Sequence, residues 1–215
     1  MAMRKLPVYL VIDCSHSMRG EPIAMVNDGL AKLAADLRNN PYALETVWLS
    51  LITFSSGTQL LMPLTEVFQL TIPALQAKGR SDLGAALRVL TEQMRNEVRP
   101  SSAEAKGDWR PVVFILSDGA PSDAWITPAK EIRAMQDAGR AVVVAFGFGS
   151  KARTENLKRL TPQVMLSQSA EPDCLARFLK WVSTSVSRSC SIARGGDDSR
   201  GELPPPPPGI YICPP

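Results

Sequence analysis

The chain has 215 residues, of which 45% are apolar and 21% charged, and this length and composition are typical of a soluble globular protein with one full-sized core. Its 24 basic and 21 acidic side chains leave a net charge of only +3 without any lysine- and arginine-rich run, which argues against nucleic acid as a partner. No segment approaches the roughly 18 consecutive apolar residues of a membrane span, so we expect no membrane partner either.

The four cysteines are too scattered to suggest a disulfide framework or a zinc site. They are Cys14, Cys174, Cys190 and Cys213, and none stands in a C-x-x-C pair. Residues 1–5 lead straight into an apolar run and lack the hydrophobic core of a signal peptide. We therefore expect a cytoplasmic protein, because thiols stay reduced in that compartment.

Near-continuous apolar runs predict strands that are buried on both faces, as in a parallel sheet. These runs cover residues 7–13, 46–55, 110–118 and 140–146. Residues 57–62 follow a turn and are expected to form an antiparallel edge strand, and residues 163–166 give a weaker sixth candidate.

Apolar residues spaced three and four apart, together with capping residues, predict four helices between the strands. These helices cover residues 23–37, 83–98, 127–139 and 175–186. Pro22 suits the first turn of its helix, and in the third helix Thr127 is expected as N-cap with Pro128 next and Gly139 as the stop. A shorter helix is predicted over residues 154–160.

This alternation of strands and helices predicts an α/β fold. We expect a doubly wound, mostly parallel sheet with one antiparallel edge strand and helices on both faces. Ligands of such sheets bind in the crevice at the carboxyl ends of the strands, near the topological switch point. Asp13 and Asp118 both end predicted strands, so their side chains could point into one crevice.

The composition changes near residue 190. We divide the chain into a domain over residues 1–190 and a Gly/Pro-rich C-terminal tail over residues 191–215. Residues 204–208 are an unbroken proline run and should form extended polyproline II. The short apolar patch at residues 210–212 is interpreted either as part of a frayed tail or as a strand that docks on the domain or on a partner.

Three segments far apart in the sequence place oxygen-bearing side chains at strand ends or helix starts. Asp13, Ser15 and Ser17 follow the first strand, with a spacing that turns side chains of an extended loop to one side. Ser81 begins the second helix and Asp118 ends a central strand, with Asp82 and Asp123 expected to flank them. An all-oxygen donor set is what magnesium, calcium and manganese prefer, and of these we expect magnesium or manganese before calcium. We interpret Asp13, Ser15, Ser17, Ser81 and Asp118 as metal ligands that leave one position open for an acidic side chain of a protein partner.

Other interpretations of the same residues remain open. Each serine could instead cap a helix N-terminus, and the chain could be an interaction module that needs no metal. A hydrolase would have to use Ser15 or Ser17 with His16, the only histidine of the chain, but neighbours in a loop rarely meet with the geometry of a nucleophile and its base. Residues 147–151 are too short for a phosphate-binding loop. We therefore expect no enzymatic activity.

The segment Asp13-Cys14-Ser15-His16-Ser17 resembles the D-x-S-x-S signature of von Willebrand factor A domains, where it forms a metal-ion-dependent adhesion site. The segments LVIDCSHSM, LITFSS, GRSDLGAAL, FILSDGAPSD and VVAFGFGS occur in the order of that family, and the resemblance extends over residues 7–188. It implies that Ser15 and Ser17 bind the ion through their hydroxyls, that Asp118 does so directly or through water, and that Asp13 does so through water.

Two positions depart from the family pattern. Ser81 stands where the family usually has threonine, and His16 stands where it usually has glycine. The segment LKWVSTSVS and the proline-rich ending resemble the bacterial TerY-like group of tellurium-resistance and stress-response clusters. This resemblance implies a cytoplasmic adaptor or substrate that acts with a Ser/Thr kinase and a phosphatase of the protein phosphatase 2C type.

Overall fold

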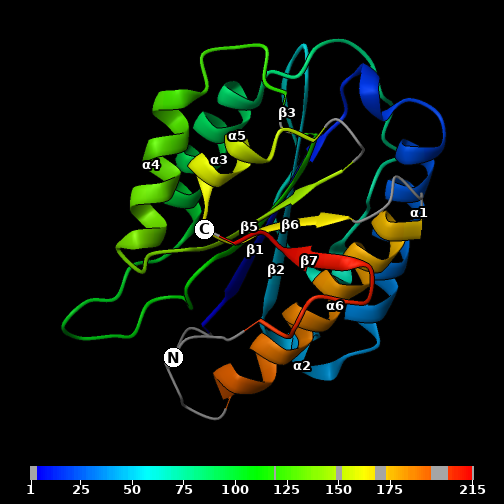
Figure 1. The fold of residues 1–215 in the computed structure, drawn as a ribbon. Helices are drawn as coiled ribbons and strands as arrows, with labels where there is room; N and C mark the ends of the chain where they lie inside the picture. Colours follow the sequence, from blue (N-terminus) through cyan, green and yellow to red (C-terminus); the bar gives the residue numbers. More distant parts are fainter. Residues whose placement is uncertain (1–3, 119, 149–151, 168–172, 195–202, 215) are drawn as a thin grey trace.

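Seven strands form one sheet in the computed structural model, which describes residues 4–118, 120–148, 152–167, 173–194 and 203–214 (Figure 1). Their order across the sheet is β3 (Gly57–Glu66), β2 (Val47–Ser55), β1 (Leu6–Asp13), β4 (Val112–Ser117), β5 (Val142–Gly147), β6 (Val164–Ser167) and β7 (Ile210–Ile212). The five inner strands run parallel, and the edge strands β3 and β7 run antiparallel to their neighbours. The predicted fold class is confirmed, and β7 adds a second antiparallel edge to the one expected.

Helices cover both faces of the sheet (Figure 1). One face carries α1 (Glu21–Arg38), α2 (Pro41–Thr46) and α6 (Asp173–Arg194), and the other carries α3 (Leu83–Glu97), α4 (Ile126–Asp137) and α5 (Thr154–Leu160). Two short 3-10 helices, η1 (His16–Met18) and η2 (Val67–Gln69), lie in the loops. None of the helices in the described part of the chain combines the length and apolar content that a membrane crossing requires.

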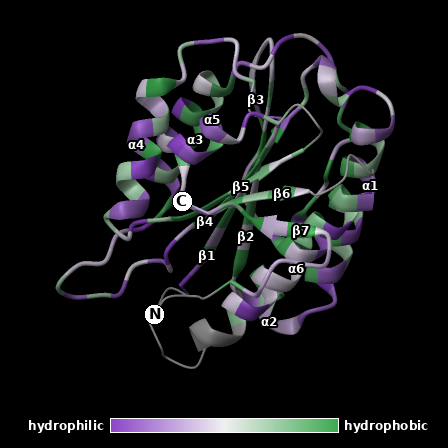
Figure 2. Cartoon of the chain, viewed as in Figure 1, coloured by the Kyte–Doolittle hydropathy of each residue, from purple (hydrophilic) through white to green (hydrophobic). Residues whose placement is uncertain are grey.

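The central strand β1 shows how the apolar runs build two cores. All eight of its residues are buried. Val8 and Leu10 pack in the core beneath α1 and α6, whereas Tyr9 and Val11 pack in the core beneath α3, α4 and α5. This alternation follows from the two-residue period of a strand. Figure 2 shows the resulting concentration of hydrophobic residues on the strands at the centre of the molecule.

Two helices differ from the sequence prediction. Helix α4 begins at Ile126 with Trp125 as its N-cap residue, so Thr127 lies inside the first turn and is not the cap. Trp125 is only 9% exposed, and its packing fixes the entry of the chain into the helix. The six-residue α2 was not predicted because it is too short to show an apolar stripe. Asn40 caps this helix, because its side-chain oxygen accepts hydrogen bonds from Tyr42 N and Ala43 N. The Asn-Pro pair at the start of the helix could have indicated this cap from the sequence.

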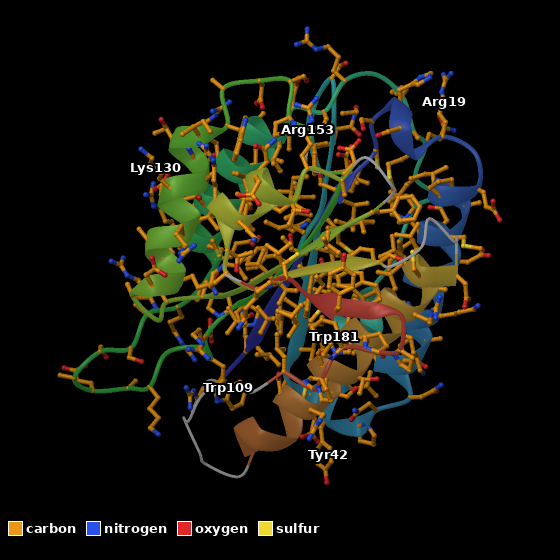
Figure 3. All side chains as sticks on the ribbon, in the orientation of Figure 1. Arg19, Tyr42, Trp109, Lys130, Arg153 and Trp181 are labelled. Carbon is orange, nitrogen blue, oxygen red and sulfur yellow. The ribbon has the colours of Figure 1, made fainter. Side chains whose placement is uncertain are left out.

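Residues 203–214 are docked on the domain, so the frayed-tail interpretation is wrong for them. Strand β7 pairs with β6 through Met165 and Ile212, and Cys213 N donates to Val164 O at 2.8 Å. On the adjoining helix, Trp181 Nε1 donates to the carbonyls of Pro204 and Pro205 at 3.1 and 3.0 Å. Figure 3 shows Trp181 beside this final segment. Helix α6 runs past the boundary expected at residue 190, and most of the predicted linker, residues 195–202, lies outside the described residues.

Candidate metal centre

The candidate site lies where the sheet reverses its direction of winding. Strands β1 and β4 are parallel neighbours, with Ile12 paired to Leu116, so their carboxyl ends meet at the same edge. From β1 the chain proceeds to β2 on one side of the sheet, and from β4 it proceeds to β5 on the other. This is the switch point at which ligands of such sheets bind. Asp13 and Ser117 are the last residues of β1 and β4.

Asp13 connects the three predicted segments through its carboxylate. Its side chain is completely buried, and Oδ1 accepts a hydrogen bond from Ser15 N at 2.8 Å. The other oxygen, Oδ2, accepts from Ser81 Oγ and from Ser117 Oγ, both at 3.0 Å. Residues that are 68 and 104 positions away in the sequence thus converge on one carboxylate.

The electrostatics of Asp13 suit a cation. Burial raises the pKa of its carboxyl, the hydrogen bonds from Ser15 lower it, the nearby charge of Asp118 raises it again, and the bond from Ser117 lowers it. No described lysine, arginine or histidine forms an ion pair with Asp13. A divalent cation beside the two carboxylates would offset both the burial and the mutual repulsion.

The serines after β1 present their hydroxyls to each other. Ser15 Oγ and Ser17 Oγ are 3.0 Å apart, with Ser17 exposed and Ser15 only 4% exposed. Ser15 stands at the N-cap position of η1, but its side chain makes no capping hydrogen bond. The cap position of α3 belongs to Asp82, while Ser81 donates its hydroxyl to Asp13. The capping alternative therefore does not describe Ser15 or Ser81.

Backbone hydrogen bonds hold the loops of the site together. His16 N donates to Gly79 O at 2.9 Å, and Ser122 N donates to Ser81 O at 2.7 Å. Gly79 adopts a φ of +76°, and a Cβ there would lie 2.4 Å from Ser56 Oγ, so this turn requires glycine. The loops after β1 and β4 accordingly gather at the upper edge of the sheet in Figure 1.

Asp118 is the least tightly connected of the five predicted ligands. It is half-buried, its Oδ1 accepts from Ala120 N at 3.0 Å, and its carbonyl accepts from Arg153 N at 2.9 Å. Its neighbour Gly119 lies outside the described residues. In the described part of the chain no hydrogen bond joins Asp118 to the serines, but Asp118 is close enough for its charge to raise the pKa of Asp13.

Sequence reasoning missed two serines of this network. Ser117 was assigned to the interior of a strand, although its place directly before Asp118 at the strand end was a usable signal. Ser122 Oγ donates to Ser81 O at 3.0 Å and to Asp82 Oδ1 at 2.9 Å. The flanking carboxylates hold the local backbone, since Asp82 also accepts from Gly57 N.

Asp123 anchors the start of α3 in the same way. Its two carboxylate oxygens accept hydrogen bonds from Gly84 N and Ala85 N, each at 2.9 Å. These are two of the backbone donors that a helix start leaves unpaired. Asp123 is therefore already engaged in fixing the helix beside the site.

The donor set of the site consists of two carboxylates and hydroxyls. Across the described residues, no three side chains among His, Cys, Asp and Glu gather in a way that could hold a metal, so any ion here depends on serine oxygens. The His16 side chain is exposed and, among the described residues, forms no hydrogen bond with the hydroxyl of Ser15 or Ser17, so the nucleophile-base pair of a serine hydrolase is not formed here. Oxygen donors of this kind fit magnesium or manganese.

A family model for the von Willebrand factor type A domain matches residues 8–179. No curated protein sequence is significantly similar to the chain. Solved structures share the fold at low identity. Proximal thread matrix protein 1 from the mussel byssus has 18% identity and a TM-score of 0.61, and the pilus adhesin SpaC from Lactobacillus rhamnosus GG has 15% and 0.66.

A further structure is described as the same mussel protein with a zinc-occupied MIDAS motif, at 17% identity and a TM-score of 0.59. The match covers 87% of the present chain for each mussel structure and 88% for the adhesin. It covers 48% of the first mussel structure, 46% of the zinc-bound one and 31% of the adhesin. The chain thus spans between about a third and about half of their lengths.

Proposed function

Because the chain belongs to the von Willebrand factor type A domain family, we propose that it is a metal-dependent protein-interaction module. The site at the carboxyl edge of the sheet would bind magnesium or manganese, and a partner would complete the coordination with an acidic side chain. The module has no catalytic role in this proposal.

The observation that carries the proposal is the convergence on Asp13. Ser15, Ser81 and Ser117 all donate to its buried carboxylate, which lacks a cationic partner among the described residues. Ser15, Ser17 and Ser81 would supply neutral oxygens, and Asp13 and Asp118 would supply charge and orient water.

Two negative charges neutralise a divalent cation without overcompensating it. An ion held mainly by hydroxyls and water keeps its attraction for a further anion, and this is the chemistry that it would supply when bound. Ser17 is exposed and Asp118 is half-buried, so the side chain of a partner could reach the ion on the side of these two residues.

The mussel protein with its zinc-occupied MIDAS motif supports a metal at this edge of the fold. The choice of ion for the present chain follows from its own donors. Zinc in proteins is bound mostly by thiolate and imidazole, whereas Asp13, Ser15, Ser17, Ser81 and Asp118 offer only oxygen. We therefore favour magnesium or manganese.

A second candidate is an interaction module that needs no metal. It is favoured by the hydrogen bonds within the protein that tie the loops together, from His16 to Gly79 and from Ser122 to Ser81. In that case the same edge would bind a partner by its shape and hydrogen-bonding groups alone.

The cellular setting rests on sequence resemblance. We propose a cytoplasmic adaptor of a bacterial tellurium-resistance or stress-response system, acting with a Ser/Thr kinase and a protein phosphatase 2C-type phosphatase. The support is the LKWVSTSVS segment of α6 and the proline-rich ending. The four cysteines are free and buried, as such a reducing compartment permits. Neither nucleic acid nor a membrane is part of the proposal.

Calorimetric titration of magnesium and of manganese into the metal-free protein tests the proposal. We expect saturable metal binding by the wild type. For Asp118→Ala we expect the metal affinity to fall by at least about ten-fold, because the variant loses a charged group of the metal site. Asp137→Ala is the matched control, because Asp137 lies on α4 and pairs with Arg133. Absence of binding by the wild type would reject the metal site, and partner binding that Asp118→Ala leaves unchanged would favour the metal-independent module.

A further inference from the structure

Four exposed cationic side chains surround the candidate metal centre. Arg19 directly follows η1, and Arg80 directly precedes Ser81. Lys78 N donates to Cys14 O at 2.8 Å, and Arg153 N donates to Asp118 O at 2.9 Å, so both are attached to the loops of the site. Figure 3 shows Arg19 and Arg153 at the same end of the molecule. We call Arg19, Lys78, Arg80 and Arg153 the cationic rim.

The charges of the cationic rim are not neutralised within the described structure. None of the four forms an ion pair with a described carboxylate. Arg19 Nε donates to Ala77 O at 3.3 Å and Arg80 Nη2 to Ser122 O at 2.9 Å, which orients two guanidinium groups but leaves their charge. On the flanks of the molecule, by contrast, Arg95 pairs with Glu131 and Arg133 with Asp137.

Three further carboxylates lie at the same edge, namely those of Glu21, Asp82 and Asp123, and hydrogen bonds from neutral groups leave their charge in place. Asp82 accepts hydrogen bonds from Gly57 N and Ser122 Oγ, and Asp123 accepts from the first backbone amides of α3. Asp13 is completely buried. With Asp13 and Asp118 matched to a divalent cation and Asp123 paired with Arg88, the four cations of the rim outnumber the carboxylates of Asp82 and Glu21, so the opening of the site keeps a net positive charge.

We infer that the partner binds through a protein segment with several acidic side chains, one at the metal and its neighbours against the cationic rim. This inference rests on the proposed metal site. A single carboxylate would satisfy the metal alone, whereas the unpaired cations around it favour further negative charge by long-range attraction. The proposal thus specifies the charge of the partner segment beyond the one coordinating residue.

A cavity beside the metal centre indicates the direction in which the partner segment would extend from the metal. It has a volume of about 210 Å³ and is lined by polar residues such as Thr53, Ser55 and Lys78 and by apolar ones such as Leu61 and Leu75. Its hydroxyl and amide groups can receive a polar side chain, and Lys78 can receive a carboxylate. A segment that places one acidic residue at the metal can therefore place the next one toward Lys78.

Three labelled peptides of equal length test the inference by fluorescence anisotropy, with magnesium in large excess. One contains six glutamates, the second one glutamate and five glutamines, and the third six glutamines. We expect the six-glutamate peptide to bind about ten-fold more tightly than the one-glutamate peptide, because several exposed ion pairs contribute modestly and together. Its advantage should shrink as salt is raised, since salt screens exposed charges.

The variants Lys78→Gln and Arg153→Gln remove single charges of the cationic rim. Each variant should lower the affinity for the six-glutamate peptide by about two- to five-fold, as expected for one exposed ion pair. The affinity for the one-glutamate peptide should stay nearly unchanged. Lys130→Gln is the matched control, because Lys130 is exposed on α4, away from the rim (Figure 3). It should change neither peptide.

The outcomes separate this inference from the proposed function. Equal binding of the six- and one-glutamate peptides, or no effect of the rim variants, would overturn the inference even if magnesium binds. If titrating magnesium into the wild type releases or absorbs no binding heat, the metal site is overturned, whatever the peptide affinities are. A single-stranded oligothymidylate that binds more tightly than the six-glutamate peptide, with the same dependence on Lys78 and Arg153, would overturn the assignment to an acidic protein segment.

Discussion

Ser117 Oγ donates a 3.0 Å hydrogen bond to Asp13 Oδ2, and this bond joins the ends of two parallel strands at the switch point of the sheet. Both groups are almost completely buried, at 1% and 0% exposure. The candidate metal centre is therefore built on the sheet itself, and the loops above it are arranged around a carboxylate that the strands hold in place.

Replacing Ser117 should destabilise the fold. Ser117→Ala removes one of the donors to the buried carboxylate of Asp13, and we expect the free energy of unfolding to fall by about 1.5–3 kcal/mol, the range for a hydrogen bond to a charged group. Urea denaturation of the metal-free protein measures this. Ser185→Ala is the matched control, because Ser185 is equally buried but donates to the neutral carbonyl of Trp181, and it should cost less. Equal losses would contradict a charged acceptor.

The titration of Asp13 should make the metal-free protein less stable as pH rises. Burial raises the pKa of Asp13 above the usual 3.8, so the folded state holds its proton longer than the unfolded state does. The free energy of unfolding should then decrease as pH rises from about 4 through the folded pKa, relative to Asp13→Asn. Urea denaturation across this range measures the difference between the two proteins. A difference that grows with pH in favour of the wild type would contradict a raised pKa.

Metal affinity should show the opposite trend with pH. A proton on Asp13 competes with the cation, so magnesium should bind more weakly at acid pH and more tightly once Asp13 is ionised. Calorimetric titrations at several pH values measure the apparent affinity. An affinity that is flat through the titration of Asp13 would show that its carboxylate takes no part in binding.

Position 81 tests whether a hydroxyl is what the site requires. Ser81→Ala removes both a predicted ligand and the donor to Asp13 Oδ2, and we expect magnesium affinity to fall by about ten-fold or more, as when a metal-site group is lost. Ser81→Thr keeps the oxygen and restricts its rotation, so binding should persist. Calorimetry on both variants measures the two effects. Equal weakening by alanine and threonine would indicate packing at this position in place of coordination.

The docking of the last residues should depend on Trp181. Trp181→Phe keeps an aromatic ring for packing against Phe178 and Phe114 but removes the hydrogen bonds to Pro204 and Pro205. We expect the Cys213 amide, which donates to Val164 O, to exchange its hydrogen about five- to ten-fold faster, since the single indole N–H is shared between the two carbonyls and its loss is worth roughly 1 kcal/mol.

Hydrogen exchange measured by NMR or mass spectrometry checks the effect on the tail. The matched control is Trp48→Phe, because Trp48 lies on β2 and its ring packs under Lys5 Nζ at 3.9 Å. Unchanged exchange of Cys213 in the Trp181 variant would mean that β7 alone holds the segment.

The sequence predicts the strands well because the central ones are buried on both faces. The apolar run before Asp13 needs no tertiary information to be assigned as a strand, and it begins only one residue earlier than expected. The two-residue spacing of Ser15 and Ser17 is visible in the same way, although the loop expected to be extended there contains the 3-10 helix His16–Met18. These features are local, so they are visible in a single sequence.

What the sequence could not supply depends on contacts between distant segments. Ser117 becomes part of the site only through the register that sets β4 against β1. Strand β7 has three residues and exists by pairing with β6, and Trp125 starts α4 because it is packed into the core. The cationic rim likewise unites residues that are unremarkable one by one, such as Arg19 and Arg153.

The tie between Ser81 and Ser122 has a kinetic consequence. Ser122 donates from its backbone and from its hydroxyl to Ser81 O, and together with the bond from His16 to Gly79 these contacts restrain the loops without the help of a ligand group. A preorganised surface loses little conformational entropy on contact. Association should therefore proceed in one step, at a rate set by diffusion and orientation and without a slow rearrangement of the loops.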